Sequence, residues 1–189
     1  MGVWFSSDGT WNDQTRTAIN KANQRLGMIK RTFKYPDEFV IKKLYTSLVR
    51  PIIEYANSVW FPLTKQSVQR RATKLIPNLR KLDYENRLRI LGLTSLEDRR
   101  TRGDLIQQFK FVKKIDKIEW SHPPIQLQNR TKGHNFKIQR ELVQNCKIRF
   151  NFFTNRIVPY WNRLPEEINS INKVDDFKKM IDRFSLVKL

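Results

Sequence analysis

Residues 69–93 read QRRATKLIPNLRKLDYENRLRILGL and predict two short helices with a turn between them. Apolar residues recur at helical spacing in the first part of this stretch and predict a helix over about 65–76. Asp83 is typical of an N-cap and Gly92 of a helix end, so a second helix is predicted over 84–91. The residues expected to face inward from the first helix are Val68, Ala72, Leu75 and Ile76.

This part of the chain is also strongly basic. Between Glu54 and Asp83 there is no Asp or Glu. The basic residues of this interval are Lys65, Arg70, Arg71, Lys74, Arg80 and Lys81. Because the apolar residues anchor one side of the predicted helix, its Arg and Lys side chains are expected to face solvent.

Two longer helices are predicted before this stretch. The first is capped by Asn12 or Asp13 and runs to about Phe33. The second starts after the break at Pro36-Asp37 and is kinked at Pro51, because proline removes an amide donor. The apolar stripe of the first helix is Ile19, Ala22, Leu26, Ile29 and Phe33. The stripe of the second is Val40, Leu44, Leu48, Ile52, Ala56 and Val59.

After this stretch the pattern stays helical and then changes period. A helix is predicted over about 95–115, a short one holds Ile157 and Trp161, and Asp175 caps a last one. Between them, residues 134–139 and 147–152 alternate in polarity, which predicts a β-hairpin.

The predicted fold is therefore mainly α, a helical bundle followed by a small α+β segment. A strand-like start, Val3 to Phe5, lies in residues 1–11. A helical domain is expected over 12–118, a linker over 119–128 and the small α+β segment over 129–189.

Charge is the outlying property of the composition. Hydrophobic residues make up 39% of the 189, enough for a core, while 37 Lys and Arg against 18 Asp and Glu give a net charge of +19. Such an excess repels itself unless an anion screens it, and nucleic acid is the first candidate partner. An anionic membrane surface is disfavoured, because no helix shows a wide apolar face with bulky aromatics opposite lysines. No apolar run approaches the ~20 residues of a membrane span.

No catalytic, cofactor or metal site is predicted. The adjacent acids that could hold catalytic metal ions all fall at predicted helix starts, where carboxylates favour the positive end of the helix dipole. These pairs are Asp37-Glu38, Glu97-Asp98, Glu166-Glu167 and Asp175-Asp176. His122, His134 and Cys146 are too few and too scattered for a structural zinc site. With one cysteine and no signal peptide in this sequence, an intracellular setting is expected.

Three clusters of basic residues are the candidate phosphate contacts, because Lys and Arg bond phosphate oxygens without reading base sequence. The alternative is that they form solvated helix faces. The first cluster is Lys21, Arg25, Lys30, Arg31 and Lys34. The second is the acid-free interval, with Lys65, Arg70, Arg71, Lys74, Arg80 and Lys81. The third is Arg99, Arg100 and Arg102, partly offset by Glu97, Asp98 and Asp104.

The tryptophans are a second kind of candidate, since bases stack on aromatic rings. Trp60 and Trp161 fall on predicted apolar faces, which favours the core for both. Trp120 lies beside Pro123-Pro124 and is the best candidate for an exposed ring.

Several blocks of sequence, in this order, resemble the C-terminal part of the reverse transcriptase of non-LTR (LINE-type) retrotransposons of the jockey, CR1 and RTE sort. The blocks are GVWFSSDGTWN, KANQRLGMIKRTF, LYTSLVRPIIEYANSVW, QRRATKLIPNLRKLDYENRLRILGLTSLEDRRTRGDLI, RTKGHNF and NFFTNRIVPYWNRLPEEIN. The resemblance covers nearly the whole chain.

The resemblance implies that residues 1–11 are the end of the polymerase palm and that a thumb and a post-thumb segment follow. A thumb of this family grips the template–primer duplex by its backbone, so RNA or RNA–DNA duplex is the implied partner, in the nucleus or a cytoplasmic ribonucleoprotein. The aromatic-x-Asp-Asp motif of the palm, the fingers and an endonuclease are absent from this sequence. The segment between Trp60 and Gln69 is shorter than the family pattern.

Two functions are therefore expected from the sequence. The first is a non-catalytic, backbone-directed nucleic-acid-binding fragment of an RNA-directed DNA polymerase. The second is a helical interaction module, in which helices 12–33 and 36–60 bury their stripes against a partner such as a separate palm and fingers.

Overall fold

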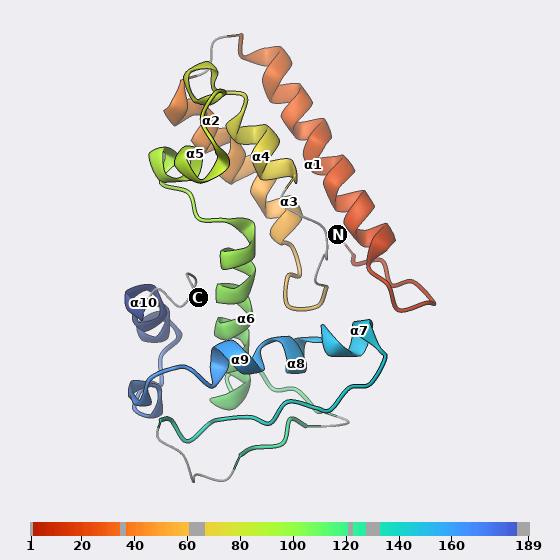
Figure 1. Cartoon of the computed structure of the whole chain (residues 1–189), viewed down its shortest axis with the longest axis vertical. Coiled ribbons are helices and arrows are strands. Elements are labelled where there is room, and N and C mark those ends of the chain that lie inside the picture. Colours follow the sequence, from red (N-terminus) through yellow and green to blue (C-terminus); the bar gives the residue numbers. More distant parts are fainter. Residues whose placement is uncertain (1, 35–36, 61–66, 121–122, 128–132, 185–189) are drawn as a thin grey trace. The chain divides into compact units, whose positions relative to one another are not determined.

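The computed structural model describes residues 2–34, 37–60, 67–120, 123–127 and 133–184 (Figure 1). They fall into two compact units, Met1–Glu97 and Asp98–Leu189. The described residues form helices and no strand, so the prediction of a mainly helical protein is confirmed, and the prediction of an α+β segment is wrong. The division between the units falls at the start of a helix, rather than in the predicted linker over 119–128.

The first unit is built on α1, Asn12–Thr32, which packs against a helix that the sequence predicted to be kinked. That second helix consists of α2 (Glu38–Leu44), a π-helical turn (Tyr45–Val49) and α3 (Arg50–Glu54). Asp37 caps α2 by accepting the Val40 amide at 2.7 Å. The core residues from these elements are Ala22, Leu26, Ile29, Ile41, Tyr45, Val49 and Ile53.

The buried stripe of the second helix lies one residue later than predicted. Its members are spaced by four residues, from Ile41 to Ile53, whereas Leu48 of the predicted stripe is 40% exposed. In an unbroken α-helix each step of four residues overshoots a full turn by about 40°, so such a stripe would fan out around the helix. The wider π turn takes up that excess just before Pro51, where the Arg50 amide reaches back to the Tyr45 carbonyl.

The stretch that decides this half of the fold forms α4 (Ser67–Thr73), a 3-10 turn (Pro77–Leu79) and α5 (Tyr84–Leu91). The predicted second helix is confirmed at both ends. The Asp83 carboxylate accepts the Asn86 amide at 3.2 Å, and Gly92 has φ +56°, a left-handed conformation that glycine adopts without strain. The first helix ends earlier than predicted, three residues before its apolar contact Ile76.

Short helices surround one long helix in the second unit. The long helix is α6, Leu96–Val112, and the last helix is α10, Val174–Phe184. Between them lie α7 (Lys147–Phe150), α8 (Phe153–Arg156), α9 (Val158–Trp161) and a 3-10 turn (Glu166–Asn169). Their shared core contains Leu105, Phe109, Ile157, Trp161, Leu164, Ile168, Phe177, Met180 and Ile181. The prediction that Asp175 caps the last helix is wrong. Asp175 lies in the first turn of α10, and its carboxylate pairs with Lys178 Nζ at 2.9 Å.

The predicted hairpin does not form. Side chains from elsewhere in the unit hydrogen-bond to backbone groups of 134–139 that a partner strand would need. The Trp161 indole donates to the Phe136 carbonyl at 2.6 Å, and the Asn162 amide bonds both backbone groups of Ile138, at 3.0 and 2.9 Å. Where this segment pairs with backbone, its neighbour is 125–127, through a single antiparallel bridge. Residues 147–150 are helical instead, and the Arg140 guanidinium covers the exposed Phe150 ring at 3.9 Å.

The strand-like start, Val3 to Phe5, forms no strand. Its Trp4 amide donates to the Gln14 side chain at 3.0 Å, and the Trp4 and Phe5 side chains are 66% and 74% exposed. Among the described helices, none is long and apolar enough to span a bilayer.

His134 is a buried anchor of the second unit, with both ring nitrogens engaged. Nε2 lies 2.9 Å from the Trp161 carbonyl, and Nδ1 accepts the Phe136 amide at 3.1 Å. This pattern requires the neutral ring, with its proton on Nε2. Burial lowers the pKa of His134 from its ordinary 6.5, an effect that the bond to Trp161 partly opposes.

We expect the second unit to lose stability as the pH falls below about 6.5. The unfolded chain binds a proton on His134 there while the folded chain resists it, so the slope is at most about 1.4 kcal/mol per pH unit. Urea unfolding at pH 7.0, 6.0 and 5.5 measures it. The variant His134→Gln should flatten this dependence, and an unchanged dependence in that variant would refute the assignment.

Candidate nucleic-acid interface

The clearest basic surface is on α4 and the turn after it. The buried residues of α4 fall on one side, and Arg70 and Arg71 fall on the other. Lys74 follows directly after the helix and is exposed as well. The sequence prediction that these three side chains face solvent is confirmed, and no acid lies between Glu54 and Asp83 to neutralise them.

A buried polar network fixes the orientation of α4. The Gln69 side chain is fully buried; it donates to the Thr94 carbonyl at 3.0 Å and accepts the Tyr84 hydroxyl at 2.6 Å. These bonds tie α4 to the first residues of α5 and to the loop after α5. Because each bond has a fixed geometry, α4 cannot rotate without leaving buried polar groups unpaired.

Arg87 of α5 completes this network from the other side. The residue is 3% exposed, and its guanidinium donates to the Thr73 hydroxyl at 3.0 Å and the Leu82 carbonyl at 2.7 Å. Two guanidinium groups lie close to the Tyr84 ring, that of Arg70 at 4.6 Å and that of Arg87 at 5.8 Å from its centroid. The exposed Arg70 is thus held over an aromatic face, which orders its side chain.

The turn that follows α4 adds two more basic side chains. Arg80 and Lys81 are both exposed, and Arg80 Nε reaches the Lys74 carbonyl at 3.4 Å. Asp83, the acid that ends the interval, is occupied as the cap of α5, and its hydrogen bonds from Asn86 lower its pKa. Lys65, the remaining candidate of this cluster, lies outside the described residues.

The first cluster is exposed but does not form a single face. Lys21, Arg25, Lys30 and Arg31 lie on α1, and Lys34 follows its end. At 3.6 residues per turn, Lys21 and Lys30 flank the buried stripe on opposite sides, and Arg31 is nearly opposite that stripe. One nucleic-acid backbone cannot meet all of them at once, so α1 contributes only part of this cluster to any one contact.

The third cluster is engaged in the internal structure of the second unit. Arg100 is 8% exposed and lies near Asp104, where burial raises the pKa of the carboxyl group and the Arg156 and Arg100 charges oppose part of that rise. Arg102 forms a two-bond ion pair with Asp182, at 2.7 and 2.9 Å. Arg99 is half-buried and also has a partner within the protein. These three arginines therefore serve folding before they can serve a ligand, unlike those of α4.

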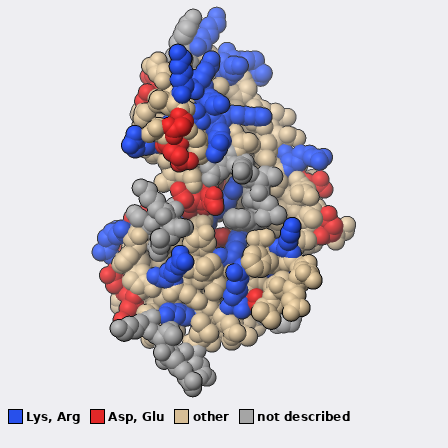
Figure 2. All heavy atoms as spheres, viewed as in Figure 1, with Lys and Arg blue, Asp and Glu red and all other residues tan. Residues whose placement is uncertain are grey.

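Figure 2 shows where the basic side chains of the first unit gather. Many lie over the end that carries α2, α5 and the C-terminal end of α1, with a smaller acidic group among them. The first unit has 17 basic and 8 acidic residues, net +9, and the second has 20 and 10, net +10. Total charge thus does not distinguish the two units. The difference is that Arg100 and Arg102 of the second unit lie beside acids, whereas Arg70 and Arg71 lie in an interval without acids.

The four pairs of adjacent acids lie at helix starts. Each pair lies in the first turn of a helix or, for Asp37, at its N-cap. In the part of the chain that the structure describes, no three His, Cys, Asp or Glu side chains are grouped to hold a metal ion. Trp60 and Trp161 are buried, as predicted, while Trp120 is half-buried.

Sequence reasoning missed the polar network beneath α4. Gln69 and Thr73 share the inward side of α4 with Val68 and Ala72, but only the apolar residues were used to predict that side. The available clue was that each polar residue directly follows an inward-facing apolar residue and so lies near the same face.

No family model, no curated protein and no solved structure matches this chain.

Proposed function

We propose that this chain binds nucleic acid through backbone phosphates, with Arg70, Arg71 and Lys74 as its central contacts. The observation that carries the proposal is the acid-free, solvent-facing side of α4, held in place by buried bonds from Gln69 and Arg87. Cations ordered in this way lose little side-chain freedom when they meet a phosphate. Arg80 and Lys81 extend the surface, and parts of the α1 cluster supplement it.

The resemblance to LINE-type reverse transcriptases suggests which nucleic acid this is. On that basis we propose a thumb-like, non-catalytic fragment of an RNA-directed DNA polymerase that grips RNA–DNA duplex inside the cell, in the nucleus or in a cytoplasmic ribonucleoprotein. Shape and phosphates would be recognised rather than base sequence, because arginine and lysine carry no sequence information in phosphate contacts.

A filter-binding titration against a mixed-sequence RNA–DNA duplex tests the proposal. We expect submicromolar affinity at 50 mM salt and a slope of log K against log salt of about −4 to −5, since each neutralised phosphate contributes about 0.9 and Arg80 and Lys81 add to the three central contacts. Micromolar or weaker binding without a salt slope would sink the proposal. A primer-extension assay with the same duplex should give no product, and measurable extension would overturn the non-catalytic assignment.

The alternative is a module that docks through the apolar stripes of the helices predicted over 12–33 and 36–60. Ala22, Leu26 and Ile29 of the first stripe lie in the core of the first unit and are not available to a partner. Leu48 and Val59 of the second stripe are 40% and 52% exposed, which leaves only part of the predicted docking surface, and we do not develop that role.

A further inference from the structure

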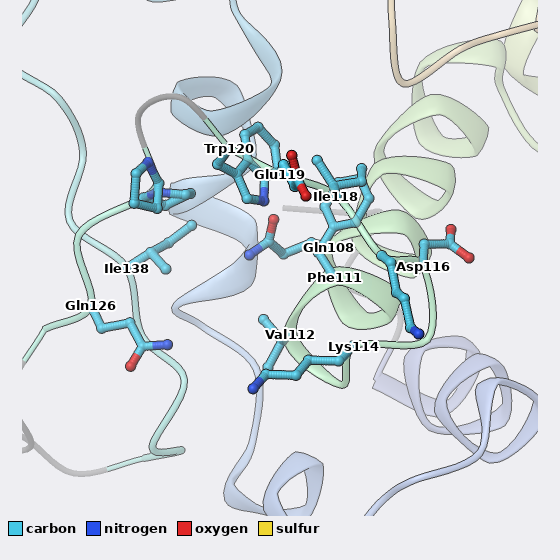
Figure 3. Close-up of a pocket in the computed structure, with 13 residues that line it drawn as sticks. Gln108, Phe111, Val112, Lys114, Asp116, Ile118, Glu119, Trp120, Gln126 and Ile138 are labelled. Atoms are coloured by element: carbon cyan, nitrogen blue, oxygen red, sulfur yellow. The ribbon is translucent and has the colours of Figure 1, made fainter.

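A pocket of about 730 Å³ lies in the second unit, at the C-terminal end of α6 (Figure 3). Its lining includes Gln108 and Phe111 of α6, Trp120 and the Pro123-Pro124 pair of the following loop, and Ile138. This volume is within the range of about 300–1,000 Å³ that small-molecule sites occupy in proteins. No function considered above uses this pocket.

Gln108 gives the pocket a polar group that the protein leaves unsatisfied. Its side chain is 3% exposed, and among the described residues its Oε1 atom has no hydrogen-bond partner. In Figure 3 the Gln108 amide lies in the middle of the lining side chains, near Trp120 and Phe111. The neighbouring Gln107, by contrast, is satisfied by Asp116 at 2.9 Å. A buried acceptor without a donor is costly, so a ligand that brings an N–H group to this point gains affinity.

The walls around this acceptor are flat and apolar. Trp120 is half-buried and meets Phe111 edge to face, with ring centroids 5.4 Å apart and planes at 88°. The two prolines and Ile138 add rigid apolar surface to the same pocket. A planar ring with N–H groups on its edge matches an aromatic wall beside a single buried acceptor.

The charges at the pocket favour a ligand that also carries a phosphate. Lys114 and Lys117 line the pocket and are exposed. Two acids, Asp116 and Glu119, line it as well. Asp116 is paired with Lys110 Nζ at 3.4 Å and hydrogen-bonded by Gln107, so its charge is already compensated. Glu119 is then the one lining acid that offsets the charges of the two lysines. The remaining balance is positive, as a site for a nucleotide requires.

We propose that this pocket binds an unpaired nucleobase of single-stranded nucleic acid, stacked on Trp120 and hydrogen-bonded to Gln108 Oε1. All natural bases carry at least one N–H donor on their pairing edge, so the pocket would favour unpaired bases over paired ones without demanding one sequence. The proposal deepens the nucleic-acid-binding function proposed above and rests on it for the identity of the ligand.

The experiment uses the full chain and two labelled ten-nucleotide single strands, one normal and one with every base removed. Both strands carry the same phosphates, so they differ only in what can enter the pocket. We expect the normal strand to bind at least five-fold more tightly. The variants Trp120→Leu and Gln108→Leu should each remove most of that difference and leave binding of the abasic strand unchanged. The matched control Trp4→Leu removes an exposed tryptophan elsewhere and should keep the full difference.

The outcomes separate the two proposals. Equal binding of both strands by the unchanged protein overturns the pocket proposal and leaves the phosphate-binding function standing. If neither strand binds, the titration against RNA–DNA duplex decides the phosphate-binding function, and the pocket is decided by titrating nucleoside monophosphates while following the Trp120 indole proton by NMR. A shift of that proton that Gln108→Leu abolishes supports the pocket, and no shift overturns it.

Discussion

A protein with Arg70, Arg71 and Lys74 all changed to alanine is expected to bind RNA–DNA duplex about 500-fold more weakly at 0.1 M salt. Each neutralised phosphate contributes about 0.9 to the slope of log K against log salt, which at this salt corresponds to roughly an eight-fold change in affinity. Three lost contacts multiply to the stated loss and make the slope shallower by up to about three. Filter binding between 50 and 300 mM salt measures both quantities.

The loss should be the same for all duplex sequences, because phosphate contacts read no bases. A matched control removes the same three charges from exposed positions of the second unit, by changing Lys147, Arg163 and Lys173 to alanine. That control should lose less than a tenth as much affinity. Equal losses in the two variants would mean that net charge alone drives binding, and a loss confined to one sequence would mean that these residues read bases.

Replacing Asp104 by alanine is expected to destabilise the second unit by about 3–5 kcal/mol, the usual cost of breaking one side of a buried ion pair. Asp104 accepts two hydrogen bonds from Arg156, at 2.8 and 2.9 Å, and the two side chains are only 4% and 10% exposed. Burial raises the pKa of Asp104, and the bonds from Arg156 offset part of this effect. Without the carboxylate, the Arg156 and Arg100 charges remain buried together.

The same unit supplies a matched control for this prediction. Arg102 and Asp182 form an ion pair with the same two-bond geometry, but their side chains are 30% and 58% exposed. Asp182→Ala should therefore cost no more than about 1 kcal/mol. Urea unfolding of both variants gives the comparison, and equal costs would show that burial does not decide the strength of these pairs.

Local sequence signals predicted the helices whose ends they mark. Asp83 and Gly92 fix α5 because a capping carboxylate and a left-handed glycine act within a few residues. The predicted hairpin failed for the complementary reason. Alternation at 134–139 shows an extended segment, but whether a strand pairs with it depends on remote groups, here the Trp161 and Asn162 side chains.

The candidate site divides in a similar way. Exposure of Arg70, Arg71 and Lys74 follows from the period of a single helix and was predictable. The pairing of Asp104 with Arg156 and that of Arg102 with Asp182 join residues of α6 to distant helices, and no local pattern encodes such contacts. The network beneath α4 escaped prediction because Gln69 and Arg87 satisfy their polar groups through tertiary contacts.

The π turn at Tyr45–Val49 holds one residue more than a regular α-helix needs to keep the buried stripe on one face. Deleting one residue between Tyr45 and Val49 would leave the stripe from Ile41 to Ile53 spaced by four, three and four residues. In a regular α-helix that spacing returns each side chain to within about 40° of the first, so Ile53 would stay in the core. A second deletion would rotate the following residues by about 100° and move Ile53 out of the core. Related sequences should therefore tolerate the loss of one residue at this turn better than any other change in length between Ile41 and Ile53.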